Sequence, residues 1–372
     1  MGNSSFVGNV SPRFPAADAV LQQAIRDHVF PGAAYGIWLQ GKAMTFAAGH
    51  FTYEPDAPLV KPETIFDLAS VSKVVATTAM AMLLWQRGQF NLEQPIADWL
   101  PEFSKTPDDA IQAERQRITV RRLLTHSSGL PAYERLFETC ETPESLFDAC
   151  LRMPLEAAPG TRAVYSDIGF ILLGRLLERL AGESLDAFCQ REIFAPLGME
   201  HTAFCPPATW KNAIPPTQLD ETQRHRVIQG EVQDENCWRL GGISGHAGVF
   251  SNVPDLLRFA ASLLQGGSPI FRPETLQIFT ARDATVVGSS RALGWDTPSQ
   301  PSSSGQYFSS HSAGHLGYTG TSLWLDFEKQ LAVVLLTNRT YPGNGVDGIS
   351  KAIQRVRPHF HDALLRELGL AG

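Results

Sequence analysis

Residues 66–73 of this 372-residue chain spell Phe-Asp-Leu-Ala-Ser-Val-Ser-Lys, and a mostly apolar run continues from them to Trp85. Lys73 is the only charged residue from Val71 to Trp85. The pattern predicts a buried helix from Val71 to Trp85. Ser70 and Lys73 stand three positions apart, so their side chains would share one face at the start of this helix.

A serine in the first turn of a helix and a lysine one turn later can form a nucleophile and its proton partner. The helix N-terminus favours negative charge that develops on Ser70. To act as a base near neutral pH, Lys73 needs its pKa lowered by about three units from a reference of about 10.4, which burial can supply. The alternative is a helix-capping serine beside a lysine that extends its ammonium group to solvent.

Period-two apolar patterns predict two strands near each end of the chain, with a helix outside each pair. Between them, residues 88–280 are richer in helical patterns and proline-punctuated loops. We therefore expect one sheet built from both chain ends, in an α/β domain of residues 1–87 and 281–372, and a helical domain of residues 88–280. The predicted strands are Ala33–Leu39, Ala43–Ala48, Ser322–Asp326 and Leu331–Leu336, and the outer helices are Ala16–Val29 and Gly345–Leu368.

The composition is that of a globular protein, with 43% hydrophobic and 19% charged residues. A net charge of -7 without a dense run of Lys or Arg argues against a nucleic-acid partner. The longest apolar stretch, Val74–Trp85, is too short to span a bilayer. The start of the chain lacks the basic and apolar segments of a signal peptide, which predicts a cytoplasmic protein, or a periplasmic one if a leader has been removed.

The sequence offers no pattern for a metal or another cofactor, and none is expected. His359 and His361, two apart on the predicted last helix, would point in different directions, and we expect both at the surface. The five cysteines show no paired spacing, which predicts buried thiols in a reducing compartment. They are Cys140, Cys150, Cys189, Cys205 and Cys237.

Two further segments place polar side chains beside predicted elements. Pro159–Asp167 ends in a Tyr-Ser-Asp triplet directly before an apolar helical pattern, and Gly314–Gly320 sets a histidine among glycines ahead of a strand. The triplet by itself could be a helix N-cap. Glycines around a histidine at the edge of a strand allow a ligand to approach the backbone closely.

Together and in this order, the Ser-x-x-Lys, Tyr-x-Asp and His-x-Gly segments resemble the serine hydrolases that include class C β-lactamases, penicillin-binding proteins and family VIII esterases. That family carries Ser-x-x-Lys on a helix, Tyr-x-Asn on a loop of the helical domain, and Lys-Thr-Gly or His-x-Gly on a central strand. The resemblance covers nearly the whole chain. It implies an α+β fold of the β-lactamase/transpeptidase type, an antiparallel sheet flanked by helices with an inserted, mostly helical domain. Further matching stretches are Leu123–Pro131, Ile193–Met199 and Gly241–Ser251.

The resemblance implies a catalytic role for three side chains. Ser70 would be the nucleophile that forms an acyl-enzyme. Lys73 and Tyr165 would share the transferred proton, and which of the two removes it from Ser70 stays open. The backbone N–H groups of Ser70 and Tyr318 would form the oxyanion hole. The chain contains no G-x-S-x-G pentapeptide, so an α/β-hydrolase nucleophile is unsupported.

The matched substrate-binding positions are Asp167, His315 and Gly317, and two of them depart from the family pattern. Asp167 stands where the family has Asn; an ionised carboxylate accepts hydrogen bonds but donates none, which weakens the grip on an amide. It would also favour the ammonium form of Lys73, unless Asp167 itself is protonated. His315 replaces a lysine and, with a pKa near 6.5, would be mostly neutral at pH 7.

Because both departures weaken recognition of an anionic amide, we expect a cofactor-free hydrolase of small esters with weak β-lactam hydrolysis. Its partners would be small ester, amide or β-lactam molecules, with neither nucleic acid nor membrane. One alternative is a peptidase of the D-alanyl carboxypeptidase or D-aminopeptidase kind, which the missing leader argues against. Another is a non-catalytic, penicillin-binding-like scaffold, which Asp167 keeps open. The oligomeric state is not predicted.

Three other polar positions have simpler interpretations. His126 follows a predicted helix and is expected to be structural. His246 lies between Gly245 and Ala247, where it could line the cleft, although a structural role is favoured. Residues 234–236, Asp-Glu-Asn, are expected to form a solvated loop, with a wall of the substrate site as the alternative.

Overall fold

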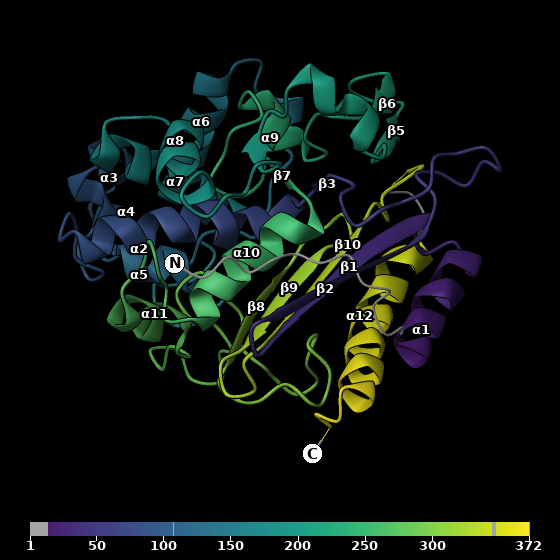
Figure 1. The fold of residues 1–372 in the computed structure, drawn as a ribbon. Helices are drawn as coiled ribbons and strands as arrows, with labels where there is room; N and C mark the ends of the chain where they lie inside the picture. The colour runs from purple at the N-terminus through teal and green to yellow at the C-terminus, as the bar shows by residue number, and fades with distance from the viewer. Residues whose placement is uncertain (1–13, 107, 344–346, 372) are drawn as a thin grey trace.

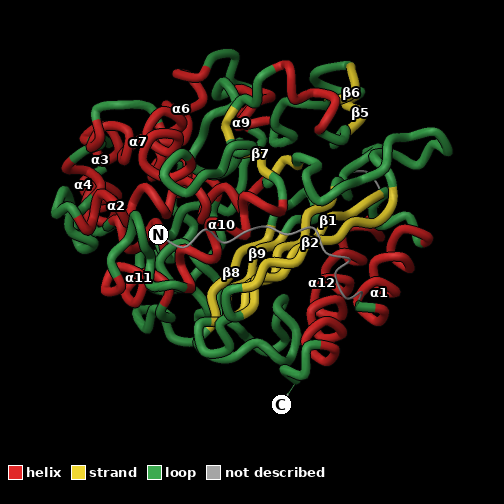
Figure 2. The backbone as a smooth tube through the Cα atoms, in the orientation of Figure 1, coloured by secondary structure: helices red, strands yellow, loops and turns green. Residues whose placement is uncertain are grey.

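A five-stranded antiparallel sheet forms the centre of the molecule (Figures 1 and 2), a computed structural model that describes residues 14–106, 108–343 and 347–371. The strand order is β2-β1-β10-β9-β8, so the two chain ends build one sheet as the sequence predicted. The strand that carries His315, expected at the centre of the sheet, is the edge strand β8. The bounds are β1 Gly32–Leu39, β2 Lys42–Gly49, β8 Ser312–Leu316, β9 Ser322–Asp326 and β10 Leu331–Thr337.

Two terminal helices, α1 (Pro15–Arg26) and α12 (Asp347–Glu367), cover one face of this sheet (Figure 1). An apolar layer that includes Tyr35 and Leu335 fills the space between the strands and these helices. Both residues stand opposite each other on the paired strands β1 and β10 and are fully buried. The two outer helices therefore have the positions that an α+β fold with both termini in one layer requires.

Helix α10 (Val253–Leu264) packs on the other face of the sheet, against β1 and β10. A Cβ at Gly36 would lie 2.3 Å from Val253 Cγ1, so the glycine lets this helix approach the strand closely. This helix, which the predicted boundaries assign to residues 88–280, packs on the sheet. The reason is its strong apolar face, which a local pattern assigns to a helix without naming the surface it covers.

Helices dominate the rest of residues 69–280 (Figure 2). The predicted buried helix is confirmed: residues 71–84 are all buried, in a tight turn η1 (Ala69–Val71), a wider turn η2 (Lys73–Thr78) and the α-helix α2 (Ala79–Gln86). Other helices are α3 Pro101–Ser104, α4 Asp109–Gln116, α5 Val120–Leu124, α6 Pro143–Arg152, α7 Asp167–Ala181, α8 Leu185–Cys189, α9 Glu235–Arg239 and α11 Pro273–Thr280. Short helical turns are η3 Ile96–Asp98, η4 Leu136–Glu138, η5 Gln190–Phe194 and η6 Ala208–Ala213.

Two small sheets lie outside the central one. The order β3-β7-β4 joins three segments that are distant in sequence, and β5 pairs with β6. The first of these sheets ends next to Ser70, because β3 directly precedes the Ser-x-x-Lys segment. The bounds are β3 Phe66–Asp67, β4 Ala203–Phe204, β5 Gln218–Asp220, β6 Arg226–Ile228 and β7 Val249–Ser251.

Two expectations about single side chains are wrong. His361 is fully buried on α12, where its ring packs beside Phe308 and Phe360, whereas His359 is exposed as expected. Cys205 is exposed, whereas the other four cysteines are buried. In both cases burial depends on which other element covers the side chain. The spacing of apolar residues along the sequence does not predict that partner.

In the described ranges, no helix has the length and apolar character needed to cross a membrane. The same part of the chain contains no group of three or more His, Cys, Asp or Glu side chains placed to hold a metal ion.

Candidate active site

The backbone in front of Ser70 is fixed by the buried carboxylate of Asp67. Asp67 accepts hydrogen bonds from the N–H groups of Ala69 (2.8 Å) and Gln233 (2.7 Å). Ala69 has a φ of +47°, a conformation that costs a non-glycine residue energy and is found where function requires it. Burial raises the pKa of Asp67 to about 6, although both N–H groups lower it. Asp67 therefore holds the strained turn that presents Ser70.

Lys73 lies fully buried below Ser70 and donates three hydrogen bonds. Its Nζ lies 3.0 Å from Ser70 Oγ, 2.6 Å from Asp167 Oδ1 and 2.9 Å from the carbonyl oxygen of His246. Burial by itself would lower the pKa of Lys73, but the nearby Asp167 and Tyr165 raise it above its ordinary value. The lowered pKa that Lys73 would need as a base is therefore not reached, because Asp167 compensates for the loss of water. In the resting site Lys73 is an ammonium group, the form that an ionised Asp167 was expected to favour.

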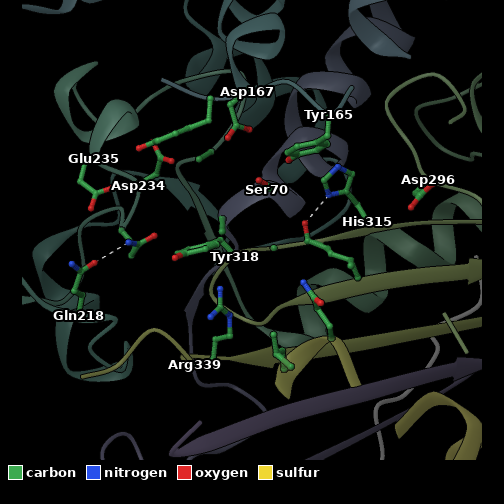
Figure 3. A pocket seen from close by; sticks show the side chains of 18 of the residues that line it. Ser70, Tyr165, Asp167, Gln218, Asp234, Glu235, Asp296, His315, Tyr318 and Arg339 are labelled. Carbon is green, nitrogen blue, oxygen red and sulfur yellow. Dashed lines mark hydrogen bonds between the residues drawn. The ribbon is translucent and has the colours of Figure 1, made fainter. Parts of the chain in front are cut away.

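Tyr165 lies next to this pair, and Figure 3 shows its hydroxyl pointing toward Ser70. Lys73 Nζ is 4.9 Å from the centre of the Tyr165 ring. Burial raises the pKa of Tyr165, and the Lys73 ammonium opposes this only in part. The phenol is thus protonated near neutral pH and can donate a proton.

Asp167 owes its position to the start of α7. Ser166 caps this helix, accepting a hydrogen bond from the Gly169 N–H at 3.0 Å. The Ser166 N–H donates to Nδ1 of buried His126 at 3.0 Å, which gives His126 the structural role that the sequence predicted. Asp167 follows as the first residue of the helix, and its side chain, about one sixth exposed, reaches Lys73.

His315, on the edge strand β8, is buried and neutral. Its Nδ1 lies 2.8 Å from the Leu316 carbonyl oxygen, so Nδ1 carries the proton and Nε2 has a free lone pair. Burial, together with the positive charges of Lys73 and Arg291, holds the pKa of His315 well below 6.5. The direction of this pKa agrees with the neutral state predicted for His315.

The loop after β8 is tied to the segment in front of Ser70. The hydroxyls of Thr319 and Thr321 donate to the carbonyl oxygens of Asp67 and Leu68, each at 2.8 Å. A Cβ at Gly317 would lie 2.0 Å from Thr321 Oγ1 and 2.4 Å from the Leu68 carbonyl oxygen, so only glycine fits there. This contact places the backbone of residues 317–318 next to Ser70.

These residues surround a cavity of about 780 Å³ (Figure 3). Six of the seven residues singled out in the sequence line it, and Lys73 lies beneath its floor. His246 does not line it: its ring contacts Ser244 Oγ and Asp234 Oδ1, each at 2.8 Å. The six lining residues are Ser70, Tyr165, Asp167, His315, Gly317 and Tyr318.

Sequence reasoning favoured the wrong alternative for one segment of the cavity wall and missed three arginines. Asp234 and Glu235 line the cavity, so residues 234–236, expected to be a solvated loop with a wall as the alternative, form part of the wall. Arg291, Arg339 and Arg357 line it as well. Of these, only Arg339 carried a signal, since it follows a predicted strand by three residues, at an end of the sheet where binding residues gather.

Comparison with known proteins identifies the family. The family model described as Beta-lactamase matches residues 17–356 of the chain. The chain belongs to the beta-lactamase family. An N-acetylmuramyl-L-alanine amidase of Bacillus subtilis (strain 168) is 32% identical to this chain over 353 residues. The alignment covers 84% of this chain and 78% of the amidase.

Solved structures share the fold of this beta-lactamase family member. EstCE1, a hydrolase with promiscuous acyltransferase activity, is 24% identical with a TM-score of 0.74, covering 94% of this chain and 97% of its own. A beta-lactamase/D-alanine carboxypeptidase from Pseudomonas syringae is 20% identical with a TM-score of 0.70, covering 96% and 99%. The protein is therefore a serine hydrolase with the β-lactamase/transpeptidase-like fold.

Proposed function

We propose that this hydrolase cleaves small carboxylic esters through an acyl-enzyme on Ser70. The observation that carries the proposal is the contact of 3.0 Å between Ser70 Oγ and the buried Nζ of Lys73, at the wall of a cavity large enough for a small ester. The backbone N–H groups of Ser70 and Tyr318 would bind the oxyanion of the tetrahedral intermediate.

The charge states of the resting site define a proton path for acylation. Lys73 Nζ first releases one of its protons to Asp167 Oδ1 at 2.6 Å, and the resulting amine takes the proton of Ser70 Oγ as Oγ bonds to the ester carbonyl carbon. Tyr165, protonated at the start, donates its proton to the leaving alkoxide as the ester C–O bond breaks. Asp167 is in this scheme the proton acceptor, and Lys73 the relay.

Hydrolysis of the acyl-enzyme reverses these transfers. The Tyr165 phenolate takes a proton from water, and the resulting hydroxide attacks the acyl carbon. The bond between this carbon and Ser70 Oγ breaks, and Oγ recovers its proton from Lys73, which is recharged by Asp167. Each group returns to its starting charge, so no cofactor is required by this scheme.

Esters are favoured over β-lactams because of Asp167 and His315. The carboxylate of Asp167 is engaged by Lys73 and has no N–H to donate to a substrate amide. His315 is neutral and supplies no cation for a substrate carboxylate. Weak β-lactam hydrolysis remains compatible with the same nucleophile.

A second candidate is amide hydrolysis of the peptidase kind, which the 32% identity with the Bacillus subtilis amidase favours. The same acyl-enzyme chemistry applies to an amide, with an amine as the leaving group. A non-catalytic scaffold is disfavoured, because it would not need a buried Lys73 in contact with Ser70.

The test is hydrolysis of para-nitrophenyl butyrate by the wild type and by Ser70→Ala, with a fluorophosphonate probe to label the nucleophile. We expect turnover and labelling of the wild type at Ser70, and neither in the variant. Equal turnover by both proteins would exclude Ser70 as the nucleophile. Labelling without ester turnover, combined with release of an amine from a para-nitroanilide peptide, would favour the second candidate.

A further inference from the structure

Two buried arginines line the cavity on the side of the sheet. Arg339 follows β10, and Arg357 lies within α12; their exposed fractions are 6% and 4%. Figure 3 shows Arg339 beside Tyr318, across the cavity from Asp167 and Tyr165. The cavity therefore has guanidinium groups at one end and the reactive serine near its middle.

Neither guanidinium has a carboxylate partner among the residues that the structure describes. Arg357 donates to the carbonyl oxygens of Gly317 (2.6 Å), Thr321 (2.9 Å) and Gly320 (3.3 Å). Arg339 stacks over the Tyr318 ring at 4.4 Å from its centre, and its buried Nε makes no hydrogen bond within the described ranges.

The carboxylates of the cavity wall are engaged elsewhere or lie on other elements. Asp167 pairs with Lys73, Asp234 with His246 at 2.8 Å, and Asp296 accepts from Ser290 Oγ at 2.6 Å. Glu235 stands on α9 and lies beside Asp234 in Figure 3. Among the side chains that the structure describes, none thus neutralises the positive charge at the sheet end of the cavity.

A buried guanidinium without a counter-ion is costly, and two of them near each other repel. Burial, with a contribution from Arg339, lowers the pKa of Arg357 to about 9, and burial lowers the pKa of Arg339. A substrate anion would remove this cost, and a carboxylate matches the planar donor geometry of arginine. Arg357, already bound to three carbonyl oxygens, would support the loop, whereas Arg339 interacts with the Tyr318 side chain and keeps its Nε–H without a partner in the described ranges.

We propose that Arg339 binds a carboxylate of the substrate, so that the preferred ester carries one negative charge. The inference rests on the proposed ester hydrolysis and names its substrate class. Because Arg339 packs on Tyr318, the carboxylate lies on the side of the cavity where the Tyr318 N–H would hold the oxyanion. A neutral His315 provides no positive charge for a substrate anion. Arg339, directly after β10, would provide that charge instead.

The first experiment compares matched pairs of esters on the wild-type enzyme. The acyl-side pair is para-nitrophenyl hexanoate and mono-para-nitrophenyl adipate, and the leaving-side pair is phenyl butyrate and meta-carboxyphenyl butyrate. We expect kcat/KM to be at least about tenfold higher for the anionic ester in one of the two pairs, mainly through KM. Equal or lower values for the anionic ester in both pairs would overturn the proposal without any variant.

The second experiment assigns the preference to Arg339. In Arg339→Gln, kcat/KM for the anionic ester should fall at least about tenfold more than kcat/KM for the neutral ester, so that the preference is lost, and Arg339→Lys should keep part of it. Arg152→Gln, which removes an equal charge from an exposed side chain paired with Asp148, should keep all of it. A preference that persists in a folded Arg339→Gln protein, or that disappears in Arg152→Gln, would refute the assignment.

Calorimetric binding of mono-para-nitrophenyl adipate to Ser70→Ala separates this inference from the proposed function. If Ser70→Ala turns over esters like the wild type, the proposed function fails. If Ser70→Ala is inactive and binds the adipate ester, while the double variant with Arg339→Gln binds it at least about tenfold more weakly, both proposals hold. Equal binding by the single and double variants would refute the anion site alone.

Discussion

The ammonium group of Lys73 uses its full donor capacity, with one hydrogen bond each to Ser70, Asp167 and the His246 carbonyl. Because all three protons have partners, the resting site stores its proton on Lys73 and its negative charge on Asp167. This differs from a site with a free amine beside the serine. In the proposed scheme, Asp in place of the family's Asn at position 167 would therefore change both proton transfer and substrate recognition.

Replacing Asp167 with Asn tests both effects. In Asp167→Asn the relay loses its acceptor, so we expect kcat/KM for para-nitrophenyl butyrate to fall by about tenfold or more. The new amide N–H can donate to a substrate carbonyl, so turnover of a cephalosporin such as nitrocefin should rise relative to the ester. Steady-state kinetics on both substrates measures this ratio.

The matched control is Asp148→Asn, which removes a charge from an exposed carboxylate paired with Arg152. It should leave both activities unchanged. An unchanged ratio in Asp167→Asn, with both substrates reduced equally, would contradict this account of ester preference.

Gly317 provides a second test at a single residue. Gly317→Ala places a Cβ where Thr321 Oγ1 and the Leu68 carbonyl oxygen lie, so the loop must move away from Ser70. We expect kcat/KM for the ester to fall by about a hundredfold, the size associated with loss of one oxyanion donor. Gly343→Ala, where a Cβ would meet no atom within 4 Å, should retain full activity. Wild-type activity in Gly317→Ala would show that the loop does not contribute to the oxyanion hole.

At the level of elements, hydrogen bonds to another segment fix the helical segment that carries Ser70 and Lys73, whereas α12 packs on the sheet. The helical segment 69–86 is buried nearly throughout and is tied to residues 245–249: the Thr77 hydroxyl donates to the Gly245 carbonyl at 2.7 Å, and Ser72 Oγ accepts from the Val249 N–H at 3.1 Å. Helix α12 covers the sheet and contains a buried histidine. A buried histidine in an apolar layer makes the stability of an element depend on pH.

His361 on α12 predicts a loss of stability in acid. Burial lowers the pKa of His361 to about 3, below its ordinary value of 6.5. Since the unfolded chain then binds more protons, this stabilising contribution is complete above pH 6.5 and is lost as the pH falls toward 3. Over the 1.5 pH units from 6.5 to 5 it amounts to about 2 kcal/mol.

Urea unfolding between pH 7 and pH 5 measures this dependence. His361→Gln should unfold with a pH dependence that is weaker than that of the wild type by about the same amount. His359→Gln, a substitution at an exposed position of the same helix, should follow the wild type. Parallel curves for His361→Gln and the wild type would disprove the assignment.

At the scale of the whole molecule, the active site lies where three distant parts of the chain meet: the start of the buried helix, the start of α7 and the end of β8. The loop after β8 reaches across a separation of more than 250 residues to Asp67 and Leu68. Correct assembly of the whole fold is therefore a condition for the site, and unfolding of either part abolishes it.

The reactivity of the five free cysteines toward a thiol reagent tests whether the folded protein keeps its buried side chains inaccessible. Cys205 is exposed, and the other four thiols are buried in the described structure. A thiol reagent such as Ellman's should label one thiol per native chain and five after unfolding in guanidinium chloride. Cys205→Ser should label none rapidly in the native state. Rapid labelling of several native thiols would mean that the helical part opens readily.

Much of the fold could be predicted from local patterns. Alternating apolar residues gave strands at both chain ends, and the apolar run after Ser70 gave the buried helix, because side-chain period reports local burial. The order of the Ser-x-x-Lys, Tyr-x-Asp and His-x-Gly motifs indicated the family, and the resemblance to that family predicted the residues that line the cavity around Ser70. The neutral state of His315 was predicted from its residue type alone.

The tertiary structure alone decided which charges meet. Asp167 lies 94 residues from Lys73, and only the packing of α7 beside the buried helix brings them within 2.6 Å and keeps the lysine protonated. In the same way, the packing of α10 on the sheet, the burial of His361 and the entry of Arg339 and Arg357 into the cavity depend on contacts between distant elements. Periodicity fixes which face of an element is apolar, but the partner of that face, and the partner of each charge, is set by three-dimensional packing.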